Sequence, residues 1–170
     1  MATANTFSLC SPDVVDGRAL PKEFTGDGEG VTPPLQWTNA PAGTRNYAII
    51  MHHTDAQNVI FSYWILYNIP ADVQSLPKDV KGIGTLGLSS RGNHMGYTPP
   101  HSAGLGTRTY VFTIYALSAP PQFTVPPSEV SREALLDAMK DITLASADLS
   151  VTYTRYTPPV AGNDMPIIGN

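Results

Sequence analysis

Three apolar segments, rich in β-branched and aromatic residues, constrain the fold of this chain more than any other feature. They are YAIIMHHT (47–54), FSYWILYNI (61–69) and RTYVFTIYAL (108–117), and each is bounded by turn-forming residues. Such residues favour β-strands. In the last two segments both sets of alternate residues are largely apolar, which predicts strands that are covered on both faces. We therefore expect a β protein with a buried central sheet.

The remaining elements are weaker or shorter. One helix is predicted over 128–142, where apolar residues recur at helical spacing and Ser128 or Ser131 can cap the first turn. Further strands are predicted at 6–11, 82–88 and 148–156. Long Pro- and Gly-rich connections lie at 24–45, 70–81 and 89–107. Loops of this length in a compact domain are often functional.

Composition and charge restrict the classes of partner. The formal net charge is −4 and no run of Lys or Arg is present, so we expect neither a nucleic-acid partner nor binding to an anionic membrane. The single cysteine, Cys10, excludes an internal disulfide and a cysteine-rich zinc site. The first residues contain neither a signal peptide nor an apolar span, so we expect a cytoplasmic protein with no stable membrane insertion. The length predicts one domain over 1–156, followed by an irregular tail at 157–170; the oligomeric state stays open.

Two histidines and an aspartate close the first apolar segment. Neighbouring side chains on a strand point to opposite faces, so His52 and His53 cannot easily bind one ion together. His53 and Asp55 share a face, but a zinc site needs a third protein ligand. The other two histidines, His94 and His101, do not lie at a spacing from this pair that is typical of a third zinc ligand. We therefore predict no metal and no cofactor, and we expect His52 to be solvated or bonded to a loop.

A series of motifs in one order resembles a known family. The stretch FTGDGEGVTPPLQWTNAPAGTRNYAIIM (24–51) is similar to the pattern D-G-x-x-x-S-P-P-L-x-W followed by P-x-G-T and a strand. The motifs YNIP (67–70), GYTPP (96–100), YVFTIYAL (110–117) and ADLSVTYTR (147–155) follow in the same order. Over about residues 6–156 the chain resembles the phosphatidylethanolamine-binding protein family, which includes the bacterial Raf-kinase-inhibitor-like proteins. The resemblance implies a mainly β fold, an antiparallel β-sandwich with one main helix in the C-terminal half, and a small anion-accepting pocket.

The chain departs from the family at the pocket itself. The family uses a D-P-D-A-P segment, a histidine before the YNIP-like strand end, and an H-R-Y segment. In this sequence His53 stands at the first aspartate position, Tyr63 at the first histidine and Arg108 at the second, whereas Asp55 and Tyr110 are retained. The changed positions therefore carry other polar or ionisable residues. A pocket that had lost its function and become part of the core would be expected to carry apolar side chains there.

The loop at 89–107 is expected to form the rim of this pocket together with 53–60. Within it, Pro100 matches the family's G-P-x-P-P loop, and His101 follows it. We expect Tyr97, Pro100, His101 and His94, with Asp55 and Tyr110, to contact a ligand. For His94 and His101 a merely solvated position is the alternative.

The chemistry of the three substituted residues leaves two main hypotheses open. Arg108 can pair with a carboxylate or phosphate, histidine can exchange a proton near neutral pH, and Tyr63 can donate a hydrogen bond. Strand alternation predicts that Tyr63 shares a face with Ile65 and Tyr67, opposite to a buried Trp64. The first hypothesis is a protein that binds a small anionic or polar-headed molecule. The second is a cofactor-independent lyase, isomerase or cyclase in which His53, Tyr63 and Arg108 are catalytic. A role in regulating a kinase pathway rests on the family resemblance alone.

Overall fold

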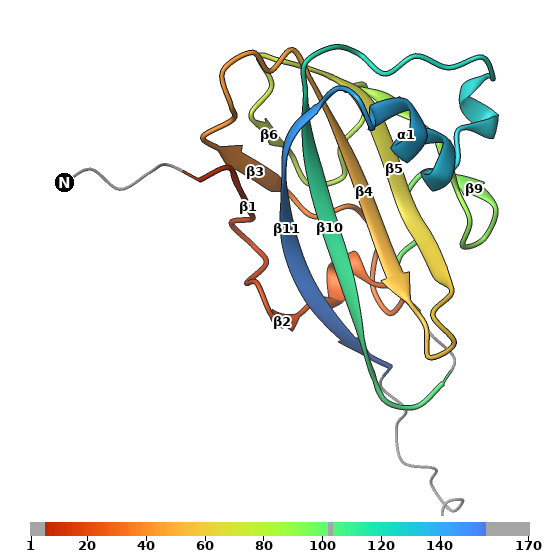
Figure 1. The fold of residues 1–170 in the computed structure, drawn as a ribbon. Helices are drawn as coiled ribbons and strands as arrows, with labels where there is room; N and C mark the ends of the chain where they lie inside the picture. Colours follow the sequence, from red (N-terminus) through yellow and green to blue (C-terminus); the bar gives the residue numbers. More distant parts are fainter. Residues whose placement is uncertain (1–5, 102–103, 156–170) are drawn as a thin grey trace, which may run out of the picture.

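A six-stranded sheet forms the centre of the fold (Figure 1). The computed structural model describes residues 6–101 and 104–155. The strand order is β2 (Arg18–Ala19), β11 (Thr143–Thr154), β10 (Thr107–Leu117), β4 (Asn46–Thr54), β5 (Ile60–Pro70) and β7 (Thr85–Leu86). Neighbouring strands are antiparallel, except that β2 runs parallel to β11. The mainly β prediction is confirmed.

A smaller antiparallel sheet packs on one face of the large sheet. It contains β1 (Ser8–Cys10), β3 (Leu35–Thr38) and β6 (Ser75–Leu76), and a short hairpin of β8 (Leu88–Ser89) and β9 (His94–Met95) lies apart from it. Between the two sheets, Leu35 and Trp37 pack with Ile49, Met51 and Trp64 in one core. Trp37 and Trp64 are 2% and 1% exposed, as the sequence predicted.

The helix α1 (Arg132–Met139) covers the other face, together with the 3-10 helix η2 (Pro127–Glu129). Ala48, Ile50 and Ile65 of the sheet form a second core with Leu135 and Met139. This layer explains why the central strands are apolar on both faces. Another 3-10 helix, η1 (Lys22–Phe24), follows β2.

The predicted helix was too long at both ends. It begins after Ser131, whose side chain accepts the Ala134 N–H at 3.1 Å. The strand β11 begins at Thr143, five residues before the predicted start at 148, because pairing with β10 continues as far as Leu117 opposite Thr143. Tertiary pairing therefore set this boundary, and local sequence did not.

A bulge in β5 overturns the predicted direction of Tyr63. Met51 pairs with Trp64 and His52 pairs with Ser62, so Tyr63 is the extra residue. Such a bulge re-aims a side chain. Tyr63 consequently packs in the core between the sheets with Trp64, whereas Ile65 and Tyr67 pack on the helix side.

The predicted tail at 157–170 lies outside the described residues. Within 6–101 and 104–155, no helix is both long and apolar enough to cross a membrane.

Candidate functional site

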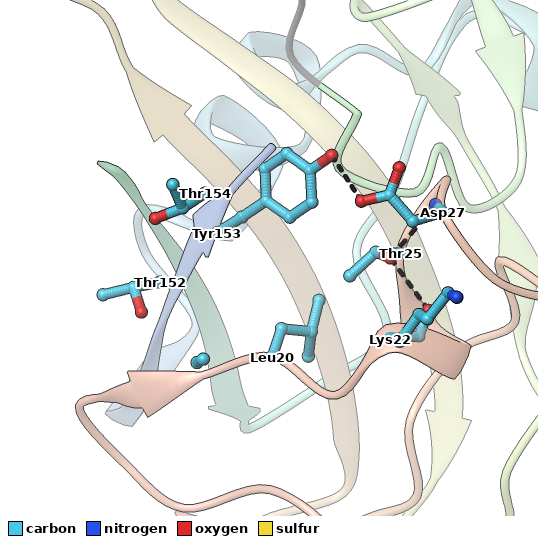
Figure 2. Close-up of a pocket in the computed structure, with 8 residues that line it drawn as sticks. Leu20, Lys22, Thr25, Asp27, Thr152, Tyr153 and Thr154 are labelled. Atoms are coloured by element: carbon cyan, nitrogen blue, oxygen red, sulfur yellow. Dashed lines mark hydrogen bonds between the residues drawn. The ribbon is translucent and has the colours of Figure 1, made fainter. Parts of the chain in front are cut away.

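The end of β4 and the beginnings of β5 and β10 surround a cavity of about 260 Å³. It is lined by His53, Asp55, Phe61, Tyr63, Arg91, Gly104 and Arg108. The three residues predicted to act together, His53, Tyr63 and Arg108, thus share one cavity although they are far apart in the sequence. We call it the anion cavity. A larger cavity, of about 490 Å³, lies beside η1 and the end of β11 and contains none of the predicted residues (Figure 2).

His53 presents one ring nitrogen without a partner. The residue is 7% exposed, and its Nδ1 lies 2.9 Å from the carbonyl oxygen of Thr109. Because a carbonyl only accepts, Nδ1 carries the hydrogen. The Nε2 atom is buried and has no hydrogen-bond partner among the described residues. Since buried polar atoms are normally paired, this atom is available to a ligand.

Arg108 also has an unpaired buried nitrogen. Its Nε is buried without a hydrogen-bond partner in the described part of the chain. A Cβ at Gly104 would lie 2.8 Å from the Arg108 Nη2, so the glycine leaves room for the guanidinium. The arginine is therefore placed in the wall with unused hydrogen-bonding capacity.

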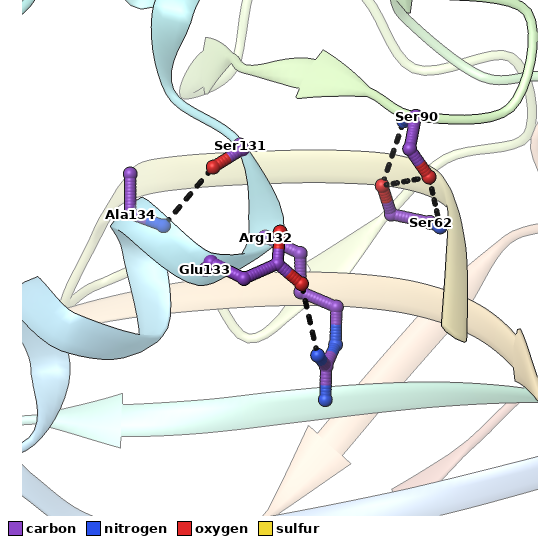
Figure 3. A network of polar contacts seen from close by, with 6 residues as sticks. All are labelled: Ser62, Ser90, Ser131, Arg132, Glu133 and Ala134. Atoms are coloured by element: carbon purple, nitrogen blue, oxygen red, sulfur yellow. Dashed lines mark hydrogen bonds and ion pairs between the residues drawn. The ribbon is translucent and has the colours of Figure 1, made fainter. Parts of the chain in front are cut away.

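Arg91 is a second guanidinium in the same wall, and the sequence reasoning missed it. Its N–H donates to the Ser62 carbonyl at 3.0 Å, and its guanidinium carbon lies 5.3 Å from the centre of the Phe61 ring. Next to it, Ser90 and Ser62 exchange two hydrogen bonds of 2.9 Å between side chain and main chain (Figure 3). The only signal in the sequence was an arginine in a loop already expected to be functional.

Tyr110 supports the cavity from beneath. Its ring packs edge-to-face on Tyr63 and lies beside His53, with 5.0 Å between ring centres in both cases. It is fully buried and is not among the residues that line the cavity. Burial raises the pKa of Tyr110 well above its usual value, with the Tyr63 hydroxyl adding to this shift and Arg108 opposing it. Tyr110 therefore stays protonated and packs against the two rings, His53 and Tyr63, that line the cavity.

Asp55 has a structural role in addition to its place in the wall. Its Oδ1 accepts the N–H groups of Gln57 and Val59, both at 2.9 Å. These bonds stabilise the turn between β4 and β5, which carries one side of the cavity.

The structure divides the predicted rim residues. His101 lines an adjoining cavity of about 110 Å³ together with Tyr63 and Arg91, and its Nε2 lies 3.1 Å from Asp27 Oδ1. His94 is exposed on β9 and lines none of the cavities described for residues 6–101 and 104–155.

Tyr97 and Pro100 anchor the rim loop to the rest of the fold. The Tyr97 hydroxyl donates to the Phe24 carbonyl at 2.7 Å, and the Pro100 carbonyl accepts the Gly26 N–H at 2.9 Å. Burial raises the pKa of Tyr97 far above its usual value. Both residues are engaged with the protein itself.

His52 points to the opposite face of the sheet, as the alternation predicted. Burial lowers its pKa, the nearby Arg132 guanidinium lowers it further, and Asp148 opposes both effects. Among the described residues, no three His, Cys, Asp or Glu side chains come together as a metal site would require.

Known proteins share the sequence pattern and the fold of this chain. The phosphatidylethanolamine-binding protein family matches residues 10–154. The chain belongs to this family. An archaeal relative, a UPF0098 protein of Methanothermobacter thermautotrophicus, is 32% identical over 82% of this chain and 93% of its own length. A solved homologue of the family, CT736 of Chlamydia trachomatis, superposes with a TM-score of 0.81 at 28% identity and covers 90% of this chain and 100% of its own.

Two further relatives extend the comparison. Escherichia coli YbcL superposes with a TM-score of 0.76 over 88% of this chain and 99% of its own, but at 22% identity it shows the fold alone. A protein of Mycobacterium tuberculosis, provisionally named lipoprotein LppC, is 31% identical over 77% of this chain and 64% of its own length. Because one relative is named as a lipoprotein, the cytoplasmic location of this chain stays a prediction.

Proposed function

We propose that the protein binds a small organic anion of the phosphomonoester or carboxylate class in the anion cavity. The observation that carries this proposal is the presence of two guanidinium groups, Arg91 and Arg108, in one cavity of about 260 Å³. Guanidinium groups match the oxygen pairs of phosphate and carboxylate, and such charge-assisted bonds are stronger than neutral ones. The unpaired Nε2 of His53 adds a third group that an anionic oxygen can contact.

The shape of the site favours an anion that carries a substituent. A second, more open cavity of about 410 Å³ shares His53, Asp55 and Arg108 with the first and continues past Leu105. An anionic group between the arginines therefore leaves space for an organic portion towards the solvent. The family is named for phosphatidylethanolamine, whose headgroup carries a phosphate with an organic substituent, and this supports a phosphate-bearing ligand.

A second candidate function, cofactor-independent acid–base catalysis, is favoured by the orientation of His53. The Thr109 carbonyl fixes the hydrogen on Nδ1, which leaves Nε2 as a base facing the cavity. Tyr63 lies in the same wall as a proton donor, and Arg108 can stabilise an enolate or alkoxide. These groups suit a cofactor-independent lyase, isomerase or cyclase reaction.

Calorimetric titration with phosphoethanolamine, inorganic phosphate and ethanolamine tests the binding proposal. We expect both phosphates to bind and ethanolamine not to bind. The double variant Arg91→Ala/Arg108→Ala should lose the binding, whereas Arg18→Ala, at an exposed arginine of β2, should retain it. Binding that persists in the double variant, or no binding of either phosphate by the parent, would refute the proposal. NMR spectra of a bound ligand over time separate the two candidates, because only an enzyme converts it.

A further inference from the structure

The cavity of about 490 Å³ is separate from the anion cavity and arises where β2 leaves β11. The two strands pair only at Val151 and Thr152, and the last bond joins the Leu20 N–H to the Thr152 carbonyl at 2.9 Å. The chain then turns into η1, while β11 continues to Thr154. The space that opens is lined by Ala19, Leu20, Lys22, Thr25, Asp27, Thr152, Tyr153 and Thr154.

Much of the wall is apolar, and some of its polar groups already form hydrogen bonds within the protein. Leu20 and Tyr153 are 5% and 4% exposed, and in Figure 2 the side chains of Thr152 and Thr154 lie on the opposite side of β11 from Tyr153. The Tyr153 hydroxyl donates to Asp27 Oδ2 at 2.9 Å. Burial and the Asp27 carboxylate raise the pKa of Tyr153 to about 12, so this donor keeps its proton at neutral pH.

Thr25 is satisfied in the same way. Its hydroxyl donates to the Lys22 carbonyl at 2.8 Å and accepts the Asp27 N–H at 3.1 Å. The hydroxyl is therefore engaged with the protein on both sides, and it adds little to the recognition of a ligand.

Two formal charges of opposite sign face this cavity. The Lys22 ammonium has no hydrogen-bond or ion-pair partner within residues 6–101 and 104–155. The Asp27 carboxylate is on the same side of the cavity (Figure 2), and each of its oxygens retains capacity for a further hydrogen bond. A charged ligand would meet one like and one opposite charge here, whereas an anion in the anion cavity meets two guanidinium groups and the single carboxylate of Asp55.

From this arrangement we propose that the larger cavity is a second site, which binds an uncharged, mainly apolar small molecule with one hydroxyl or amide group. The apolar body packs between Leu20 and the Tyr153 ring. The hydroxyl donates to Asp27 and accepts from Lys22, so both charged groups are satisfied without a net charge on the ligand. The volume falls in the usual range for small-molecule sites.

A series of three compounds with one apolar body tests the proposal: 4-phenylbutan-1-ol, 4-phenylbutyrate and 4-phenylbutylamine. The affinity of the full chain for each is measured by ligand-observed NMR titration in an Arg91→Ala/Arg108→Ala background, because the anion cavity is itself proposed to bind carboxylates. We expect the alcohol to bind at least about threefold more tightly than the acid or the amine, the size of one exposed charge interaction. Lys22→Glu should make the amine the tightest ligand, and Ala19→Trp should remove the binding of all three by filling the cavity. Lys140→Glu, at an exposed lysine after α1, is the matched control and should leave the order unchanged.

Several outcomes would overturn the proposal. Tighter binding of the acid than of the alcohol in this background would show that Lys22 and Asp27 together do not favour an uncharged ligand. An order that Lys22→Glu does not change would show that Lys22 does not face the ligand. Failure of the alcohol to bind at about 10 mM, or unchanged binding in Ala19→Trp, would show that the cavity is not a site. None of these results depends on whether the anion cavity binds phosphate.

Discussion

Replacing Arg108 by alanine should weaken anion binding more than any other single change in the cavity wall. Its Nε is buried and has no hydrogen-bond partner among residues 6–101 and 104–155, so an anion gains a charged hydrogen bond in a site that excludes much of the solvent. Such a bond contributes about 1.5–3 kcal/mol, which corresponds to a rise in Kd of roughly 10- to 150-fold. Arg91 is exposed and stacks on Phe61, so Arg91→Ala should cost only about 1 kcal/mol, or about fivefold. Arg108→Lys should recover part of the loss, because an ammonium lacks the planar fork of the guanidinium.

Sulfate is the suitable probe for this comparison, because it stays doubly charged throughout the neutral pH range. Its Kd is measured by calorimetry for the parent, Arg108→Ala, Arg108→Lys and Arg91→Ala, with Arg18→Ala as the control. A loss below about twofold in Arg108→Ala, in a parent that binds sulfate, would refute the assigned role of Arg108. A larger loss of sulfate affinity in Arg91→Ala than in Arg108→Ala would show that the more buried arginine does not contribute more to binding.

Three further predictions concern stability and the space around the site. In the parent, burial and Arg132 lower the pKa of His52, so the unfolded chain takes up a proton between pH 7.5 and pH 5.5 that the folded chain does not, and the free energy of unfolding falls. His52→Gln should make this fall smaller in urea unfolding. An equal fall in the variant and the parent would contradict the assigned pKa shift. Gly87→Ala should destabilise the fold by about 1–3 kcal/mol in the same assay, because a Cβ would lie 2.6 Å from the Val130 carbonyl oxygen, and an unchanged unfolding midpoint would show that the chain yields there. Gly104→Ala should leave the stability unchanged but lower the affinity for sulfate severalfold, because its Cβ would displace only the end of the flexible Arg108 side chain. An unaltered affinity for sulfate would count against this contact.

Local pattern was sufficient to predict the central strands and the layer on each side of them. The segments that became β5 and β10 carry apolar residues at both sets of alternate positions, and a strand between a second sheet and a helix requires this. The sequence offered Ser128 and Ser131 as helix caps, and the structure uses Ser131, which accepts the N–H of Ala134. These features depend on residues within a few positions of one another.

The remaining features depend on contacts between distant segments. The bulge at Tyr63 follows from its register against Met51 and His52, and it moved the side chain to the face opposite to the one predicted by alternation. Arg91 joined the site because Ser90 bonds to Ser62, across a sequence separation of 28 residues. Neither pairing leaves a periodic signal in the sequence.

A crystal structure of the protein soaked with selenate, located by its anomalous scattering, tests the anion site most directly. We expect one selenate between the guanidinium groups of Arg91 and Arg108, with an oxygen within hydrogen-bonding distance of His53 Nε2. Selenate at exposed lysines only, with the anion cavity empty at saturating concentration, would contradict it.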